Sequence, residues 1–395
     1  MIAPLAARGL RHARRFPRPF WALTGADSVA ALGAGIFVPY FALYLTTERG
    51  ASGAQAGGLL ALAGVMGIVG APLGGFAADH FGRRRTLLTG IALSAGFFTS
   101  FGVVDSLGLL TALIPLFAIG SDLMGPAISA AIADMIEPEL RAEAYGLRRQ
   151  VQQLAFALGP PLGALIVLGL SLRWLFVFAG IGSLIFFAVV WRELPETKPA
   201  HVEGTPRPRF RDALHDRTLL LLALGSGIGV AVYCQFDSVL GVFLHRDRGY
   251  ALATWGLLFA INPMLIGLFQ YVVARWAARR RARTMLASGA VLEGAALFVL
   301  WFTSVWPVLV AAIAVLTLGE MLINPVASAF AARIAPVTLR GTYEGVVDTA
   351  FAVAWPPSVL VGLSLVGAGH GEVLLAGALP LALVGALCFA RLPDP

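Results

Sequence analysis

Apolar segments long enough to cross a lipid bilayer recur along the whole sequence. A spanning helix needs about 20 consecutive residues that are mostly apolar, and such segments follow one another through the 395 residues. Charged residues make up only 13% of the chain, and its mean hydropathy is +0.81. A soluble domain with so few charges would lack the polar surface that keeps it in water. The sequence therefore predicts an all-α integral membrane protein.

The apolar segments predict twelve transmembrane helices. The first is far too long to be the apolar part of a signal peptide, so we expect it to be a membrane helix in its own right. The expected ranges are residues 20–46, 52–78, 86–104, 107–133, 146–171, 173–192, 217–244, 252–276, 284–303, 306–333, 344–367 and 372–391.

Arginines gather in alternate loops and so predict the orientation of the chain. Clusters lie at residues 8–18, 83–85, 207–217 and 275–283, whereas the loops expected on the other side hold only Arg49, Arg173, Arg246 and Arg248. Loops rich in Arg and Lys stay on the cytoplasmic side of a membrane. We therefore expect a multi-pass protein of the bacterial cytoplasmic (inner) membrane with both termini in the cytoplasm. The net charge of +7 then matches the lipid headgroups, and no nucleic-acid partner is expected.

The turn between the second and third helices carries a distinctive motif. Gly75, Asp79, Gly82, Arg83 and Arg84 form the pattern G-x-x-x-D-x-x-G-R-R in a loop too short to fold by itself. Glycine permits the tight turn, and the arginines are expected to lie in the headgroup layer. The pattern resembles the signature loop between helices 2 and 3 of the major facilitator superfamily, a large class of secondary transporters.

The resemblance implies a latch at the cytoplasmic edge of the membrane. In the family, an acid at the cytoplasmic end of helix 4 pairs with an arginine of the signature loop. Asp134 holds that place in this sequence, so a pair between Arg83 or Arg84 and Asp134 is expected, with Asp79 beside it. Such a pair would bias the chain toward one conformation.

The two halves of the chain repeat each other at an offset of 199 residues. Arg49-Gly50 recurs as Arg248-Gly249, and Pro126 recurs as Pro325. Arg, Pro and Gly carry this register, so a general bias toward apolar residues does not explain it. Parallel six-helix repeats with a substrate site between them are the architecture of major facilitator transporters. The expected divisions are a basic N-terminus 1–19, a six-helix bundle 20–192, a cytoplasmic linker 193–216, a second bundle 217–391 and a tail 392–395.

Acidic residues inside the expected helices are the main candidates for function. A carboxylate within a spanning helix costs about 2.5–3.5 kcal/mol, so each one suggests a functional site. Asp27, Asp122, Asp237 and Glu320 lie in helices 1, 4, 7 and 10, which line the central cavity in the family that the chain resembles. Glu293 lies in helix 9, which is peripheral in that family, so a structural or interfacial role is expected for it.

The chemistry of the expected cavity follows from these acids. Helices 1, 4, 7 and 10 contain no Lys or Arg, which favours neutral or cationic substrates. Burial favours the protonated form of a carboxyl group, so Glu320 or Asp122 is expected to load and release a proton. Tyr233 is four residues from Asp237 and lies on the same helix face, with Gln235 nearby. Arg148 and Arg149 are expected to anchor helix 5 at the membrane interface.

Helix 5 contains a bend motif. Gly159, Pro160 and Gly163 form the pattern G-P-x-x-G, which resembles the core of a motif in drug:proton antiporters, although Ala155 replaces an upstream glycine. Proline removes a helix hydrogen bond, and glycine allows a partner helix to approach. A bend at the interface between the halves is therefore expected.

These features favour a secondary active transporter and argue against an enzyme. The chain lacks a phosphate-binding loop with its lysine and an H-E-x-x-H motif, so no cofactor or metal is expected. The first expectation is proton-coupled efflux of amphipathic, neutral or cationic small molecules by a monomer that alternates access. The alternative is proton-coupled import of a neutral nutrient such as a sugar or small peptide, because residues 319–325 resemble a helix of proton-coupled peptide transporters.

Overall fold

The computed structural model describes residues 16–137, 140–196, 215–303, 305–336 and 340–393. Nearly all of these residues are helical, and no strand occurs among them. Twelve helices in the described part are long and apolar enough to cross a membrane. The predicted all-α fold with twelve transmembrane helices is therefore confirmed. Most of the expected N-terminal arm 1–19 and of the expected linker 193–216 lies outside the described residues.

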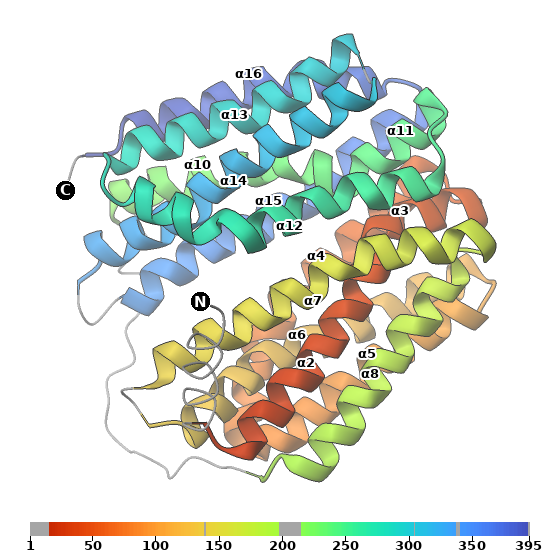
Figure 1. Cartoon of the computed structure of the whole chain (residues 1–395), viewed down its shortest axis with the longest axis vertical. Helices are drawn as coiled ribbons and strands as arrows, with labels where there is room; N and C mark the ends of the chain where they lie inside the picture. Colours follow the sequence, from red (N-terminus) through yellow and green to blue (C-terminus); the bar gives the residue numbers. More distant parts are fainter. Residues whose placement is uncertain (1–15, 138–139, 197–214, 304, 337–339, 394–395) are drawn as a thin grey trace, which may run out of the picture. The chain divides into compact units, whose positions relative to one another are not determined.

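Ten of the twelve spans are single helices, and the other two are interrupted (Figure 1). The single helices are α4 (Gly53–Phe81), α5 (Arg83–Val103), α6 (Leu107–Met135), α7 (Arg141–Gly169), α8 (Arg173–Glu193), α12 (Leu252–Ala277), α13 (Ala282–Phe302), α14 (Trp306–Ile334), α15 (Arg340–Gly367) and α16 (Gly371–Ala390). The first span consists of α2 (Arg18–Phe37), η1 (Val38–Tyr40), α3 (Phe41–Leu43) and η2 (Tyr44–Glu48). The seventh consists of α10 (Arg217–Cys234), η4 (Gln235–Val239) and α11 (Leu240–Arg248).

Local sequence signals explain where several helices begin. Ser52 and Gln55 cap the start of α4 reciprocally, because each side chain accepts a hydrogen bond from the backbone N–H of the other, at 3.2 and 2.9 Å. This arrangement is a capping box. Asp216 accepts hydrogen bonds from the first backbone N–H groups of α10, the closer at 2.8 Å. The interruptions η2 and η4 are π-helical turns, which are frequent at functional sites.

Large apolar side chains cover much of the outside of these helices. Leu168 is 73% exposed and Phe302 is 70% exposed, and many other leucines, valines and phenylalanines are similarly uncovered. Apolar patches of this extent do not occur on soluble monomers. In a bilayer they face lipid, while the backbone groups are satisfied within each helix.

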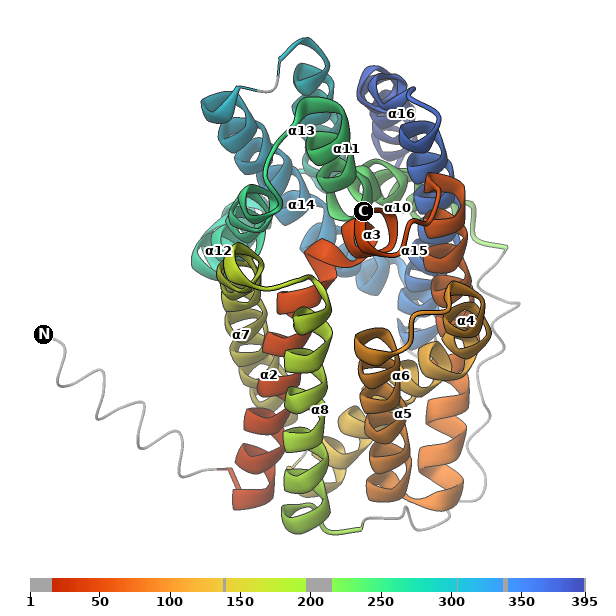
Figure 2. The same cartoon turned by 90° about the vertical axis from the view of Figure 1, so that its right-hand side faces the viewer.

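The described helices form two compact units. The first comprises Met1–Phe37, Val69–Gly159 and Arg173–Glu203, and the second comprises Val38–Ile68, Pro160–Leu172 and Gly204–Pro395. In the first unit α2 packs beside α8, and α5 packs beside α6 and α8 (Figure 2). In the second unit α13 packs against α14 and α16, and α10 packs against α15. Phe20 and Phe186 lie in the core of the first unit, and Phe330 and Phe389 lie in the core of the second.

The 199-residue repeat of the sequence also appears in how the helices pack. In the first unit, a Cβ atom on Gly90 would lie 2.7 Å from the carbonyl oxygen of Gly120. In the second unit, a Cβ atom on Gly289 would lie 2.8 Å from the carbonyl oxygen of Gly319. Each pair therefore marks a helix crossing at which the two backbones nearly touch. Because the two pairs are related by the offset found in the sequence, the duplication extends to how the helices pack.

Candidate functional site

The signature turn is a single residue between two long helices. α4 ends at Phe81 and α5 begins at Arg83, so Gly82 alone joins them. Its φ angle is +101°, a backbone conformation that glycine adopts without the steric cost of a side chain. A Cβ atom at this position would also contact the Glu196 carboxylate, which would have to move aside. The positive φ angle is therefore the reason for glycine here.

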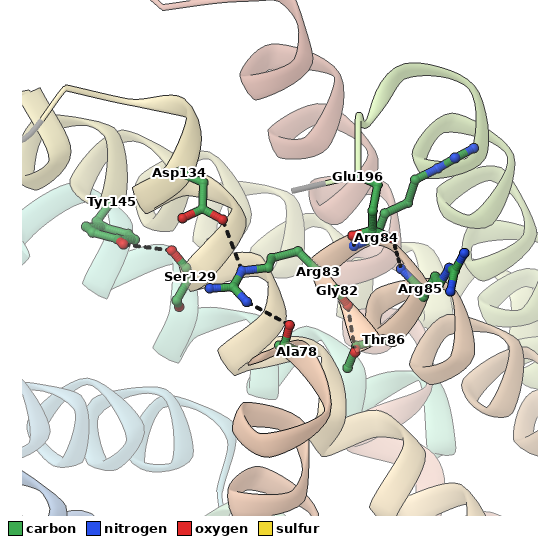
Figure 3. Close-up of polar contacts among 10 residues, drawn as sticks. All are labelled: Ala78, Gly82, Arg83, Arg84, Arg85, Thr86, Ser129, Asp134, Tyr145 and Glu196. Carbon is green, nitrogen blue, oxygen red and sulfur yellow. Dashed lines mark hydrogen bonds and ion pairs between the residues drawn. The ribbon is translucent and has the colours of Figure 1, made fainter. Parts of the chain in front are cut away.

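Arg83 ties the turn to the end of α6 (Figure 3). Its side chain is only 6% exposed. The Nε atom donates a hydrogen bond to Asp134 Oδ2 at 3.0 Å, and a terminal nitrogen donates to the carbonyl oxygen of Ala78 at 2.7 Å. Of the two arginines expected to pair with Asp134, Arg83 makes the contact, whereas Arg84 donates to the backbone carbonyl of Trp191. The side chain of Asp79 lies outside what the structure describes, and a Cβ atom on Gly75 would meet open space.

Glu196 caps the start of α5 from the segment that follows α8. One carboxylate oxygen accepts a hydrogen bond from the backbone N–H of Arg84 at 3.0 Å, and the other accepts from that of Arg85 at 3.2 Å (Figure 3). An anion at a helix N-terminus is favoured by the helix dipole and by unsatisfied N–H groups. The sequence reasoning missed this role, because more than a hundred residues separate Glu196 from α5 and no local pattern links them.

Asp27 in α2 forms a buried ion pair within the first unit. Arg148 in α7 donates from Nε to Asp27 Oδ2 at 2.9 Å, and the two side chains are 16% and 8% exposed. Gln152 Nε2 lies 3.5 Å from the other carboxylate oxygen. The charge of Arg148 therefore balances that of Asp27, and the expectation that Arg148 anchors helix 5 at the interface stays a prediction. The neighbouring Arg149 is exposed.

Asp122 and the bend motif lie elsewhere in the chain. Asp122 in α6 is half-buried and packs against Gly70 of α4, where a Cβ atom would lie 2.8 Å from that of Asp122. Gly159 of α7 meets Gly35 of α2, and a Cβ atom on Gly159 would lie 2.5 Å from the Gly35 Cα atom. Glycine thus permits the close approach expected from the motif. Pro160 lies inside α7.

The bend motif continues into the second unit. Pro160 belongs to that unit, and its carbonyl oxygen would lie 2.8 Å from a Cβ atom on Gly256. Gly163 is buried within α7.

Glu320 of α14 is the centre of a polar cluster in the second unit. Asn262 of α12 donates from Nδ2 to Glu320 Oε2 at 2.7 Å and lies 3.2 Å from the hydroxyl oxygen of Thr317. Asn324 Nδ2 lies 3.4 Å from the other carboxylate oxygen, one helical turn further along α14. Tyr233 of α10 lies close enough to Glu320 to feel its charge. Amide donors of α12 and α14 therefore converge on one carboxylate.

The π-helical turn η4 brings Asp237 to the same cluster. Asp237 accepts a hydrogen bond from Ser238 Oγ at 2.8 Å, and Tyr233 is close enough to feel the charges of both Asp237 and Glu320. Gln235 instead turns toward α15, where its Nε2 lies 3.4 Å from the carbonyl oxygen of Ser358. The structure thus brings together three of the four residues that the sequence assigned to this part of the cavity.

Glu293 of α13 is a further member that the sequence reasoning did not place in the site. Its side chain is buried at 3% exposure, and its carboxyl group interacts electrostatically with that of Glu320. One of its oxygens, Oε2, has no hydrogen-bond partner among the described residues. A usable signal was present, because Glu293 lies at mid-span and four residues after Gly289, on the face that crosses α14.

A separate group of contacts in the second unit joins the ends of four helices. The Trp255 indole of α12 donates to the carbonyl oxygen of Pro39 in η1 at 2.8 Å. Gly53 of α4 meets Gly367 of α15 so closely that a Cβ atom on Gly367 would lie 2.9 Å from the Gly53 Cα atom. The missing side chains of Gly53 and Gly367 thus let two helix backbones touch, and the Trp255 indole binds a backbone carbonyl group directly.

Duplicated helix bundles with carboxyl groups buried in the spans define a membrane transporter. The family model of the Major Facilitator Superfamily matches residues 24–281 and 236–395. The chain therefore belongs to the Major Facilitator Superfamily, and the family resemblance noted in the sequence is confirmed.

Relatives and solved structures agree with this assignment. The chain is 28% identical to the multidrug efflux pump Tap of Mycobacterium bovis over 403 residues, which cover 95% of this chain and 93% of the pump. It is 26% identical to a Na(+), Li(+), K(+)/H(+) antiporter of Planococcus maritimus, covering 77% and 79%. A POT family transporter in complex with a thioalcohol-conjugated peptide superposes with a TM-score of 0.79 at 15% identity, covering 94% and 95%. At this identity, the structural likeness shows the fold alone.

Proposed function

We propose that this transporter exports amphipathic, neutral or cationic small molecules in exchange for protons. The observation that carries the proposal is the group of three acids in the second unit, of which Glu293 is buried and Asp237 and Glu320 are half-buried. Their carboxyl groups lie in membrane-spanning helices, and no arginine or lysine pairs with any of them in the part of the chain that the structure describes. We place the protein as a monomer in the bacterial cytoplasmic (inner) membrane, with both termini in the cytoplasm.

The physical argument for proton coupling concerns the two charge states of Glu320. Burial without a cation disfavours the carboxylate, whereas the hydrogen bond from Asn262 at 2.7 Å stabilises it. The two effects oppose each other, so both the protonated and the ionised form are accessible. A proton that crosses the membrane supplies about 2.3 kcal/mol per 100 mV, which drives export of the substrate.

The preference for amphipathic or cationic substrates follows from the same cluster. When ionised, Glu320 and Asp237 attract a cation and repel an anion. The neighbouring rings of Phe236, Phe259 and Trp255 are buried against one another, with centroids 5.4 and 5.8 Å apart, so they support this part of the second unit and do not offer their faces to a substrate. The names of two relatives, a multidrug efflux pump and a cation/proton antiporter, support this preference.

Conformational control is assigned to the signature turn and the acids of the first unit. The Arg83–Asp134 pair and the Glu196 cap hold the ends of α4, α5 and α6 together. We propose that alternating access breaks and remakes these contacts while the acids of the second unit exchange protons. Asp122, which is half-buried, is assigned to substrate contact.

Reconstituted vesicles with a cationic dye test the proposal. Proteoliposomes are given an acidic lumen, their membrane potential is clamped with potassium and valinomycin, and ethidium uptake is followed by fluorescence. Protons that leave the lumen should drive ethidium inward. Glu320→Gln should abolish this uptake while dye exchange without a gradient persists, and Glu372→Gln, an exposed acid paired with Arg248, should behave as the unaltered protein.

Two outcomes would contradict the exporter. Uptake that occurs only when the outside is acidic means that dye and protons move together, which favours the importer. Uptake that is insensitive to either gradient removes proton coupling altogether.

A further inference from the structure

We propose that Glu293 and Glu320 act as one proton-binding pair, with Glu293 as the member that keeps its proton. This inference rests on the proposed proton coupling and specifies how the site achieves it. It adds a residue of α13 to a site otherwise built from α10, η4, α12 and α14.

The pair exists because α13 and α14 cross at glycines. A Cβ atom on Gly319 would lie 2.6 Å from the carbonyl oxygen of Gly289 and 2.8 Å from Cγ of Glu293. Glu293 follows Gly289 by one helical turn, and Glu320 follows Gly319 directly. The close crossing thus places the Glu293 side chain beside the residue that precedes Glu320, where Glu293 feels the charge of Glu320.

The surroundings of the two carboxyl groups differ. Glu320 receives a hydrogen bond from Asn262 at 2.7 Å, with Asn324 also in reach. Glu293 is 3% exposed, and its Oε2 atom finds no donor among the residues that the structure describes. Donors stabilise an ionised carboxylate, and burial without donors disfavours it. When the pair holds one proton, that proton therefore resides on Glu293, and Glu320 is the member that ionises.

Among the residues that the structure describes, no positive group offsets this arrangement. α13 packs against α10, α14 and α16. The titratable groups that these elements carry near the crossing are Tyr233, whose surroundings include Glu293, Glu320 and Asp237, and Cys388 of α16, which is buried. All are neutral or acidic.

Two acids in electrostatic contact titrate as a pair. Ionising both at once is disfavoured by repulsion, so the protons leave in two separate steps that belong to the pair. The neutral neighbour leaves Glu320 free to load and release a proton in a working cycle. The positions related by the repeat in the first half are Ser94 and Ser121, so that half has no equivalent pair.

Infrared difference spectroscopy during a pH titration tests the pair without any substrate. Protonated buried carboxyl groups absorb separately from carboxylates, so each can be followed in the purified protein. Glu293→Gln should remove a protonated carboxyl band that persists at neutral pH, and Glu320→Gln should remove the band that titrates. In Glu293→Asp, which keeps the acid, the persistent band should be retained, and Glu372→Gln should leave both bands unchanged.

The pH profile of dye transport provides the second readout. Because Glu293 stays neutral while Glu320 titrates, Glu293→Gln replaces one neutral group with another and should leave the alkaline limb of the profile in place. A limb that moves down by about 1 pH unit would show that an ionised Glu293 had opposed the ionisation of Glu320, and would overturn the proposal.

The two readouts separate this proposal from the proposed function. If the spectra of Glu293→Gln match those of the unaltered protein at every pH, the pair does not exist, whatever the transport assay shows. If the spectra show the persistent and the titrating band while the unaltered protein moves no dye under a pH gradient, the pair stands and proton-coupled export fails.

Discussion

Acidic side chains have different partners in the two units of this transporter. In the first unit, the buried Asp27 pairs with Arg148 at 2.9 Å, and the more exposed Asp134 pairs with the buried Arg83 at 3.0 Å. In the second, Asp237, Glu293 and Glu320 have hydroxyl, amide and carboxyl neighbours instead of arginines among the described residues. One repeated scaffold thus carries fixed ion pairs in one half and acids that can change charge in the other.

The difference follows from the energetics of buried charge. An ion pair removed from water keeps both charges at working pH, because each stabilises the other, and loss of one partner strands the second. A buried acid without a cation lowers its free energy by taking up a proton. We therefore assign helix anchoring to the first arrangement and the proposed proton exchange to the second. Four tests, one of them a matched pair of substitutions, separate these two behaviours.

The largest effect is expected from breaking the Asp27–Arg148 pair. Arg148→Ala leaves an uncompensated carboxylate in a site where the Asp27 side chain is 8% exposed. Removal of one partner from a buried pair costs about 3–5 kcal/mol, so a marked fall in thermal stability in detergent is expected. Arg149→Ala, an exposed neighbour, is the control. Equal thermal stability of the two variants would show that the Asp27–Arg148 pair does not stabilise the packing of α2 and α7.

Removal of the Asn262 side chain should change pH dependence more than stability. Asn262→Ala deletes the donor to ionised Glu320, and a hydrogen bond to a charged group is worth about 1.5–3 kcal/mol. Ionisation becomes harder, so the alkaline limb of the transport profile should move up by about 1–2 pH units, whereas Glu293→Gln should leave it in place. Asn324→Ala, at 3.4 Å from the carboxylate, should move it less. A downward shift in Asn262→Ala would reverse the assigned role.

Matched glycine substitutions compare the repeated helix crossings. Gly90→Ala and Gly289→Ala each push a methyl group to within 2.7 Å of neighbouring atoms, and overpacking of this kind costs about 1–3 kcal/mol. Similar losses of thermal stability are expected, but only Gly289→Ala should alter the pH profile, because only that crossing holds two carboxyl groups together. A pH shift in Gly90→Ala would remove the distinction between the halves.

The smallest effect is expected at the end of α5. Glu196→Gln removes the negative charge that faces the backbone N–H groups of Arg84 and Arg85, and such helix-terminus interactions contribute below about 1 kcal/mol when exposed. A slight fall in melting temperature should therefore accompany a measurable change in transport rate. Glu193→Gln, whose pair with Arg18 lies at the surface, should change neither. If Glu196→Gln leaves the transport rate unchanged, the Glu196 cap of α5 has no role in the transport cycle.

Much of the fold could be predicted because its signals lie along the sequence. Span length and hydropathy gave the twelve helices, and the 199-residue register gave the duplication that Gly90 and Gly289 show in their packing. The positive φ of Gly82 was foreseen from a motif that places glycine at a tight turn. These features depend on neighbours in sequence or on regular repetition.

Partners across helices could not be predicted in the same way. Arg148 is 121 residues from Asp27, and nothing in either helix indicates which faces meet. Glu293 was assigned from the peripheral place of its helix in the family, although its own depth in the span pointed to the site. Which atoms meet where two helices cross depends on the rotation and tilt of each helix. Rotation and tilt are set by the packing of the whole bundle.

Gly82 is the only residue between α4 and α5, so the turn cannot absorb a change in length. An α-helix advances about 100° for each residue, so inserting a single amino acid there would rotate every later side chain of α5 by more than a quarter turn. Arg83 would then swing off Asp134, and the backbone groups held by Glu196 would point elsewhere. Epitope tags or labels introduced for topology mapping should therefore avoid this turn, since even the shortest insertion would dismantle the structure being mapped.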